Sequence, residues 1–214
     1  MHFKNIMKSL VSLAAVSFIA GKAQATIPLQ LGVVLEPGFE FNKIDPTKKE
    51  KDAGEKSLNY MGVDVPVMVQ AIFLGGAFKP YFGLGYSFTY LSNDDKKNGN
   101  TKTNFKNHNI LVQAGVNYMI NPLFSAEAFV GYNFIPAPKM YFKLNGKDKN
   151  IELDSNNKFQ VGLRGYYTVM DGLDVGIAAK GIFAFMKLKG ASDSNYVMGF
   201  QANLSVRKRF DLLK

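Results

Sequence analysis

The chain has 214 residues, of which 47% are hydrophobic, and it contains no cysteine. This length allows one domain or two small ones, and the lack of cysteine excludes disulfides and cysteine-ligated metal sites. The formal net charge is +9 at pH 7. However, the basic residues are scattered, with no basic helix or stacking platform, so we do not expect nucleic-acid binding.

Residues 1–25 have the three-part layout of a secretory signal peptide. Lys4 and Lys8 give a basic start, residues 10–20 are mainly apolar, and residues 23–25 read Ala-Gln-Ala. The apolar run is shorter than the roughly 20 residues that a transmembrane helix needs. We therefore expect cleavage after residue 25 and export through the periplasm; an uncleaved anchor helix or a buried helix is the alternative.

The sequence after this segment shows period-two alternation, which predicts β-strands. The expected strands cover residues 27–41, 57–73, 79–91, 106–120, 123–134, 158–170, 173–188 and 195–210. They are longer than the five or six residues usual in soluble proteins, and about 9–11 residues suffice to cross a bilayer. One face of each segment is apolar and the other is small or polar, as in a transmembrane barrel.

Tight turns alternate with longer polar connections along the chain. The tight turns are residues 74–78, 121–122 and 171–172, and the last of these is Asp-Gly, a strong hairpin signal. The longer connections are residues 42–56, 92–105, 135–157 and 189–194. This alternation is typical of a barrel with both termini in the periplasm. We predict an all-β fold over residues 26–214, a transmembrane antiparallel up-and-down barrel of eight strands.

Aromatic residues lie near the ends of the expected strands and indicate girdles at the two membrane interfaces. Ordinary strand propensity is the alternative explanation, because Tyr and Phe favour strands. These residues are Phe39, Phe41, Tyr60, Tyr81, Tyr90, Tyr118, Phe134, Tyr141, Tyr167 and Phe210.

Residues 79–86 contain Pro-Tyr-Phe-Gly-Leu-Gly, and residues 118–127 turn one strand into the next through Asn-Pro. These two segments resemble the OmpA-like and opacity-type family of eight-stranded outer-membrane β-barrels. One departure is the C-terminus, where Phe210 is followed by four further residues instead of ending the chain. The resemblance implies an outer-membrane surface protein with a structural and interaction role, adhesin-like or antigen-like, through long extracellular loops. The alternative is a narrow porin-like channel for ions or small solutes.

Charged residues on the inward face of the expected barrel must pair, because an eight-stranded interior is narrow. We predict one ion pair between Glu127 and Arg164 and another between Asp174 and Arg207. The other expected members of this lumen set are Lys180 and Asp64. Such charges either fill the barrel or gate a thin ion path.

The sequence offers no set of catalytic or metal-binding residues. His108 is the only histidine after residue 25, and no nucleophile–base pair or zinc spacing accompanies it. We therefore expect no enzyme activity, cofactor or metal. The expected partners are outer-membrane lipid and lipopolysaccharide, with a host surface or matrix protein as a further candidate, and the barrel is expected to be a monomer. The candidate interaction residues in the loops are Lys96, Lys97, Lys102, Lys139 and Lys143.

Overall fold

The computed structural model describes residues 29–54, 56–95, 101–136, 138–144, 147–155 and 157–212. The expected signal peptide lies outside these residues. The described elements are β1 (Leu29–Leu35), β2 (Gly38–Asp45), α2 (Lys48–Asp52), β3 (Leu58–Phe73), β4 (Phe78–Asp95), β5 (Thr101–Met119), β6 (Phe124–Phe134), β7 (Lys139–Leu144), β8 (Lys147–Ser155), β9 (Lys158–Met170), β10 (Leu173–Leu188) and β11 (Asn195–Asp211). All strand pairs are antiparallel and form one sheet.

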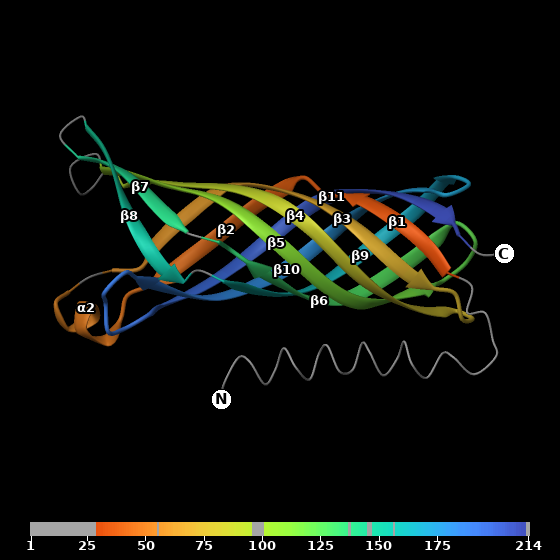
Figure 1. Ribbon diagram of the computed structural model, residues 1–214, viewed down its shortest axis with the longest axis horizontal. Coiled ribbons are helices and arrows are strands. Elements are labelled where there is room, and N and C mark those ends of the chain that lie inside the picture. The colour runs from red at the N-terminus through yellow and green to blue at the C-terminus, as the bar shows by residue number, and fades with distance from the viewer. Residues whose placement is uncertain are drawn as a thin grey trace.

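Strand pairing closes this sheet into a barrel (Figure 1). β1 and β2 are two parts of one wall strand, since each pairs with β3 on one side and β11 on the other. From β3 the pairing continues through β4, β5, β6, β9 and β10 to β11. The predicted all-β barrel of eight wall strands is confirmed. Closure leaves no edge whose backbone groups would face lipid unpaired.

The predicted element boundaries need three corrections. Pro37, which has no backbone N–H, divides the first expected strand into β1 and β2. Most of the expected loop 92–105 is strand, because β4 continues to Asp95 and β5 begins at Thr101. The expected loop 135–157 contains the hairpin β7–β8, where β7 pairs with β5 and β8 pairs with β10. The wall therefore continues beyond the ends of β6 and β9.

The barrel wall is apolar outside and polar inside, the reverse of a soluble protein. Leu84 and Ile177 point outward and are 54% and 68% exposed, whereas the inward Gln70 and Asn109 are completely buried. An exposed apolar surface that surrounds the whole wall is stable only against lipid. In the described part of the chain, no helix is long and apolar enough to cross a membrane.

Two levels of outward aromatic residues mark the edges of this apolar band. At the end with the tight turns, Phe78 contacts Tyr118 and Phe124 contacts Tyr167, with ring centroids 4.7 and 5.1 Å apart. The other level is named the upper aromatic level. There, neighbouring strands align Phe41 with Phe200, Phe88 with His108, and Phe159 with both Tyr132 and Phe183. The structure thus places most of the predicted girdle residues outward, but Tyr60 and Tyr81 point into the barrel and are buried.

The separation of the two levels fits the thickness of a membrane. On β4 the two levels are Phe78 and Phe88, and on β6 they are Phe124 and Phe134. Ten residues of strand at a tilt of 35–45° rise roughly 25 Å, the usual height of the apolar band.

The two ends of the barrel differ in the length of their connections. The start of β1 and the end of β11 lie at the end with the tight turns, while α2 and the hairpin β7–β8 lie at the other end (Figure 1). In outer-membrane barrels the short turns are periplasmic and the long connections extracellular. By this rule we expect the α2 and β7–β8 end to be extracellular, and its wall strands extend beyond the upper aromatic level.

Candidate functional site

The periplasmic half of the barrel interior is organised around Arg164, which β9 directs inward. Its Nε and Nη2 atoms donate to the two carboxylate oxygens of Glu36 at 3.1 and 3.0 Å. Its Nη1 donates to Glu127 Oε2 at 2.5 Å, and the guanidinium lies 4.2 Å from the centroid of the Phe129 ring. Lys180 Nζ, 3.2 Å from Glu36 Oε2, supplies a second cation. The planar guanidinium suits this task because it can bind one carboxylate through two atoms and a second through another.

A second group of ion pairs lies nearer the periplasmic end. Arg207 Nε donates to Asp174 Oδ2 at 2.8 Å, and its Nη1 donates to Glu127 Oε1. Arg209 Nη2 also donates to Asp174, at 2.9 Å. Glu127 binds both Arg164 and Arg207, so the two groups form one connected ion-pair network. The structure thus brings together both pairs that the sequence predicts.

One buried ion pair was missed by the sequence analysis. Lys158 Nζ lies 2.5 Å from Glu40 Oε1, and both side chains are almost completely buried. Glu40 lies an even number of residues from Glu36, and Lys158 lies an even number of residues from Arg164. Extending the alternation toward the strand ends would have placed both residues in the lumen.

The prediction that Asp64 belongs to an ion pair is wrong. Its carboxylate accepts hydrogen bonds from Ser87, from Thr89 at 2.6 Å and from Gln201 at 2.7 Å. The physical reason is register: Thr89 is the direct partner of Asp64 on β4, so a neutral hydroxyl and not a cation faces the carboxylate.

The layer of the lumen around Asp64 is rich in buried hydrogen-bond acceptors. Among the described atoms, Glu40 Oε2, Asn42 Oδ1, Asn109 Oδ1 and Gln201 Oε1 are buried without a hydrogen-bond partner. Burying such oxygens without a donor is costly, so this layer is expected to hold water molecules.

An apolar cluster fills the extracellular end of the lumen. Its buried members are Ile44, Tyr60, Leu91, Phe105, Leu153, Ala184, Met186 and Val197. Tyr60 and Phe105 pack edge to face with ring centroids 4.9 Å apart. On β4, Leu91 lies three residues beyond Phe88 of the upper aromatic level, and on β2, Ile44 lies three residues beyond Phe41. The cluster therefore closes the barrel where the wall leaves the membrane.

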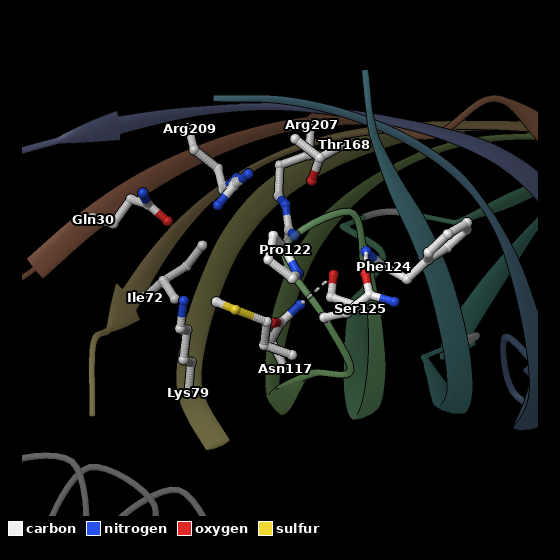
Figure 2. A pocket seen from close by; sticks show the side chains of 12 residues that line it. Gln30, Ile72, Lys79, Asn117, Pro122, Phe124, Ser125, Thr168, Arg207 and Arg209 are labelled. Atoms are coloured by element: carbon white, nitrogen blue, oxygen red, sulfur yellow. Dashed lines mark hydrogen bonds between the residues drawn. The ribbon is translucent and has the colours of Figure 1, made fainter. Parts of the chain in front are cut away.

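A small hollow of about 30 Å³ lies at the periplasmic mouth (Figure 2). Cationic and neutral polar side chains surround it, including Lys79, Arg207, Arg209, Gln30 and Asn117. This volume accommodates one or two water molecules. The lumen is thus narrow at the periplasmic end and sealed by apolar side chains at the other.

Of the five candidate loop lysines, Lys139 is the one whose side chain the structure describes. Lys96 and Lys97 lie outside the described residues, while Lys102 and Lys143 belong to β5 and β7 with side chains that are not described. Lys139 begins β7.

His108 lies within β5, on the outer wall. Its ring centroid is 5.3 Å from that of Phe88, and Nδ1 shares a hydrogen bond with the Tyr86 hydroxyl. In the described residues, no group of three or more His, Asp or Glu side chains could hold a metal ion.

Comparison with known proteins gives a match over most of the chain. The model of the family described as outer membrane protein beta-barrel domain matches residues 10–207. No curated protein matches the sequence significantly.

Several solved structures are similar in fold. Neisserial surface protein A is 12% identical, with a TM-score of 0.50 over 85% of this chain and 97% of that chain. The outer membrane protease OmpT from Escherichia coli is 9% identical, with a TM-score of 0.46 over 88% of this chain and 99% of that chain. The attachment invasion locus protein Ail of Yersinia pestis is 15% identical, with a TM-score of 0.42 over 84% and 98%.

Proposed function

Because the chain belongs to the outer membrane protein beta-barrel domain family, we propose that it is a surface protein of the outer membrane that acts through its extracellular end. The observation that carries this proposal is the apolar cluster around Tyr60 and Phe105, which fills the lumen at that end. A closed lumen favours a role for the outside of the molecule over transport through it.

Side-chain contacts join α2 and the hairpin β7–β8 to the barrel wall, and these elements together form a platform at the extracellular end. Asn195 Nδ2, at the start of β11, donates to Glu50 Oε2 of α2 at 2.8 Å. Lys189 Nζ, after β10, lies 2.6 Å from Glu152 Oε2 of β8. These contacts tie α2 and the hairpin β7–β8 to the barrel wall. A platform that is ordered before binding loses little conformational entropy when a partner binds.

We assign this platform an adhesin-like or antigen-like role, with a host surface or matrix protein as the partner. The test is a variant in which Asn-Gly replaces residues 135–156, so that Phe134 turns directly into Asn157. Asn133 and Lys158 are register partners, so a two-residue hairpin fits there. We expect cells that display this variant to lose binding to immobilised matrix proteins or to epithelial cells, relative to the wild type.

Assembly of the variant is checked by the mobility shift that folded barrels show between heated and unheated gels. A second variant replaces residues 47–56, which include α2, with a short Gly-Ser linker. Full retention of binding by both assembled variants would overturn the interaction role.

A narrow channel is the second candidate, because the acceptor-rich layer around Asp64 and Gln201 is expected to be hydrated. The two functions predict different conductance across planar lipid bilayers. A surface protein with a closed lumen gives no conductance steps, whereas F105A and Y60A, which open the apolar cluster, give small ones. Steps from the wild type that change in size in E127A would instead favour a channel gated by the ion-pair network.

A further inference from the structure

The described charged side chains on the outer wall lie at its two ends. Among the described side chains that face outward from the wall strands, Lys43, Asp45, Lys106 and Lys187 lie just beyond the upper aromatic level, and Lys208 lies at the periplasmic end. The band between these ends is apolar. The lysines beyond the upper level are therefore at the height of the lipid headgroups of the outer leaflet.

Two lysines meet at one place on this level. β5 and β7 pair through Thr103 with Phe142, Asn104 with Tyr141, and Phe105 with Met140. The next positions in the same register are Lys106 and Lys139. Met140 packs against the apolar cluster inside the barrel, so Lys139 lies on the outer face beside Lys106.

Aromatic rings hold Lys106 in place. Its Nζ lies 5.9 Å from the ring centroids of both Tyr90 and Tyr141, within the range of a cation–π contact. Tyr90 is its register partner on β4, and His108 lies two residues below it, at the upper aromatic level. The Lys106 side chain remains exposed, and these two contacts place its ammonium against the wall.

In the described residues, neither lysine of this pair forms an ion pair with a carboxylate. The register partner of Lys139 on β8 is Glu152, whose carboxylate attracts Lys139 but forms its ion pair with Lys189. Like charges at neighbouring positions on adjacent strands repel each other. An anion that binds both ammonium groups would remove this repulsion.

We infer that Lys106 and Lys139, with Tyr90 and Tyr141, form a binding site for a phosphate of the lipopolysaccharide headgroup. The height of the site on the extracellular side of the wall selects a lipid of the outer leaflet. The two ammonium groups supply the charge, and the neighbouring tyrosines supply apolar surface for the sugar ring that carries the phosphate.

The test compares lipid binding by the wild-type barrel and by the double variant K106Q/K139Q, both refolded in zwitterionic nanodiscs. Bisphosphorylated lipid A, chemically dephosphorylated lipid A and phosphatidylglycerol are titrated separately, and bound lipid is counted by native mass spectrometry. We expect the double variant to bind bisphosphorylated lipid A roughly thirtyfold more weakly, about fivefold for each lysine. We expect dephosphorylated lipid A to bind both proteins equally weakly.

The matched control is K51Q/K208Q, which removes the same charge from exposed positions on α2 and at the periplasmic end of β11. It should bind bisphosphorylated lipid A as the wild type does. An equal loss in this control would mean that overall charge, and not this site, determines binding. Equal binding of phosphatidylglycerol and bisphosphorylated lipid A by the wild type would also overturn the assignment. Neither result depends on whether the platform binds a host protein.

Discussion

The part of the barrel inside the membrane and the part that projects beyond it have opposite interiors. Within the apolar band, β4 exposes Leu84 outward and buries Ser87 in the lumen. Beyond the upper aromatic level, the same strand buries Leu91 in the apolar cluster. The medium outside the wall explains the change. Lipid accepts apolar side chains, so the lumen can be polar, whereas water drives apolar side chains inward.

The ion-pair network should be the most sensitive part of the membrane half. R164L leaves the carboxylates of Glu36 and Glu127 buried without their main cation, so we expect a loss of about 3–5 kcal/mol in the free energy of unfolding. Urea titration in lipid vesicles, followed by gel mobility and circular dichroism, measures this loss. The comparison variant is R209L. Arg209 is partly exposed and shares Asp174 with Arg207, so its loss should cost much less. Equal stability of R164L and the wild type would contradict a structural role for the network.

The outer wall should show the same boundary between lipid and water. L84R places a charge near the middle of the apolar band, and we expect a cost of about 2–4 kcal/mol. M61R places the same charge on an outward residue that is the register partner of Phe41, at the upper aromatic level, where the expected cost is about 0–1 kcal/mol. The same urea titration measures both. Similar costs for the two variants would mean that the membrane boundary does not lie at this level.

Period-two alternation predicted the wall strands because each face of a barrel strand meets a single medium within the membrane. It worked less well where the medium changes. In residues 139–144, Met140 and Phe142 alternate with Lys139 and Tyr141, which is a strand pattern. The lysines made this segment resemble a polar loop, so the strand was not predicted. The period-two alternation also places Tyr60 on the inward face, where it is buried. Its position near a strand end had led to the wrong prediction that it belongs to an aromatic girdle.

The lumen partners could be predicted only between adjacent strands. Glu127 and Arg164 are register partners on β6 and β9, and Asp174 and Arg207 are register partners on β10 and β11. The contact between Arg164 and Glu36 joins strands that are not neighbours in the wall, across the barrel interior. Such a contact depends on the radius of the closed barrel and the tilt of its strands, which no local pattern contains.

The smallest expected effect concerns α2, on the water-exposed side of the boundary. Glu50 accepts a hydrogen bond from the Thr47 backbone N–H at 2.7 Å, while Thr47 Oγ1 accepts one from the Glu50 N–H, a capping box. The Thr47 N–H, with a smaller contribution from Asn195, lowers the pKa of the Glu50 carboxyl below its usual 4.5.

A lowered pKa means that this stabilisation is fully present above pH 4.5 and is lost as the pH falls through the lower folded-state value. We therefore expect protection of the α2 amides from hydrogen exchange, corrected for the intrinsic rate, to fall by roughly fivefold or less on acidification. E50Q should show weaker protection at neutral pH and little further loss in acid, whereas D52N, on the same helix, should keep the wild-type profile. A pH-independent wild type would show that the Glu50 cap does not hold α2 to the platform.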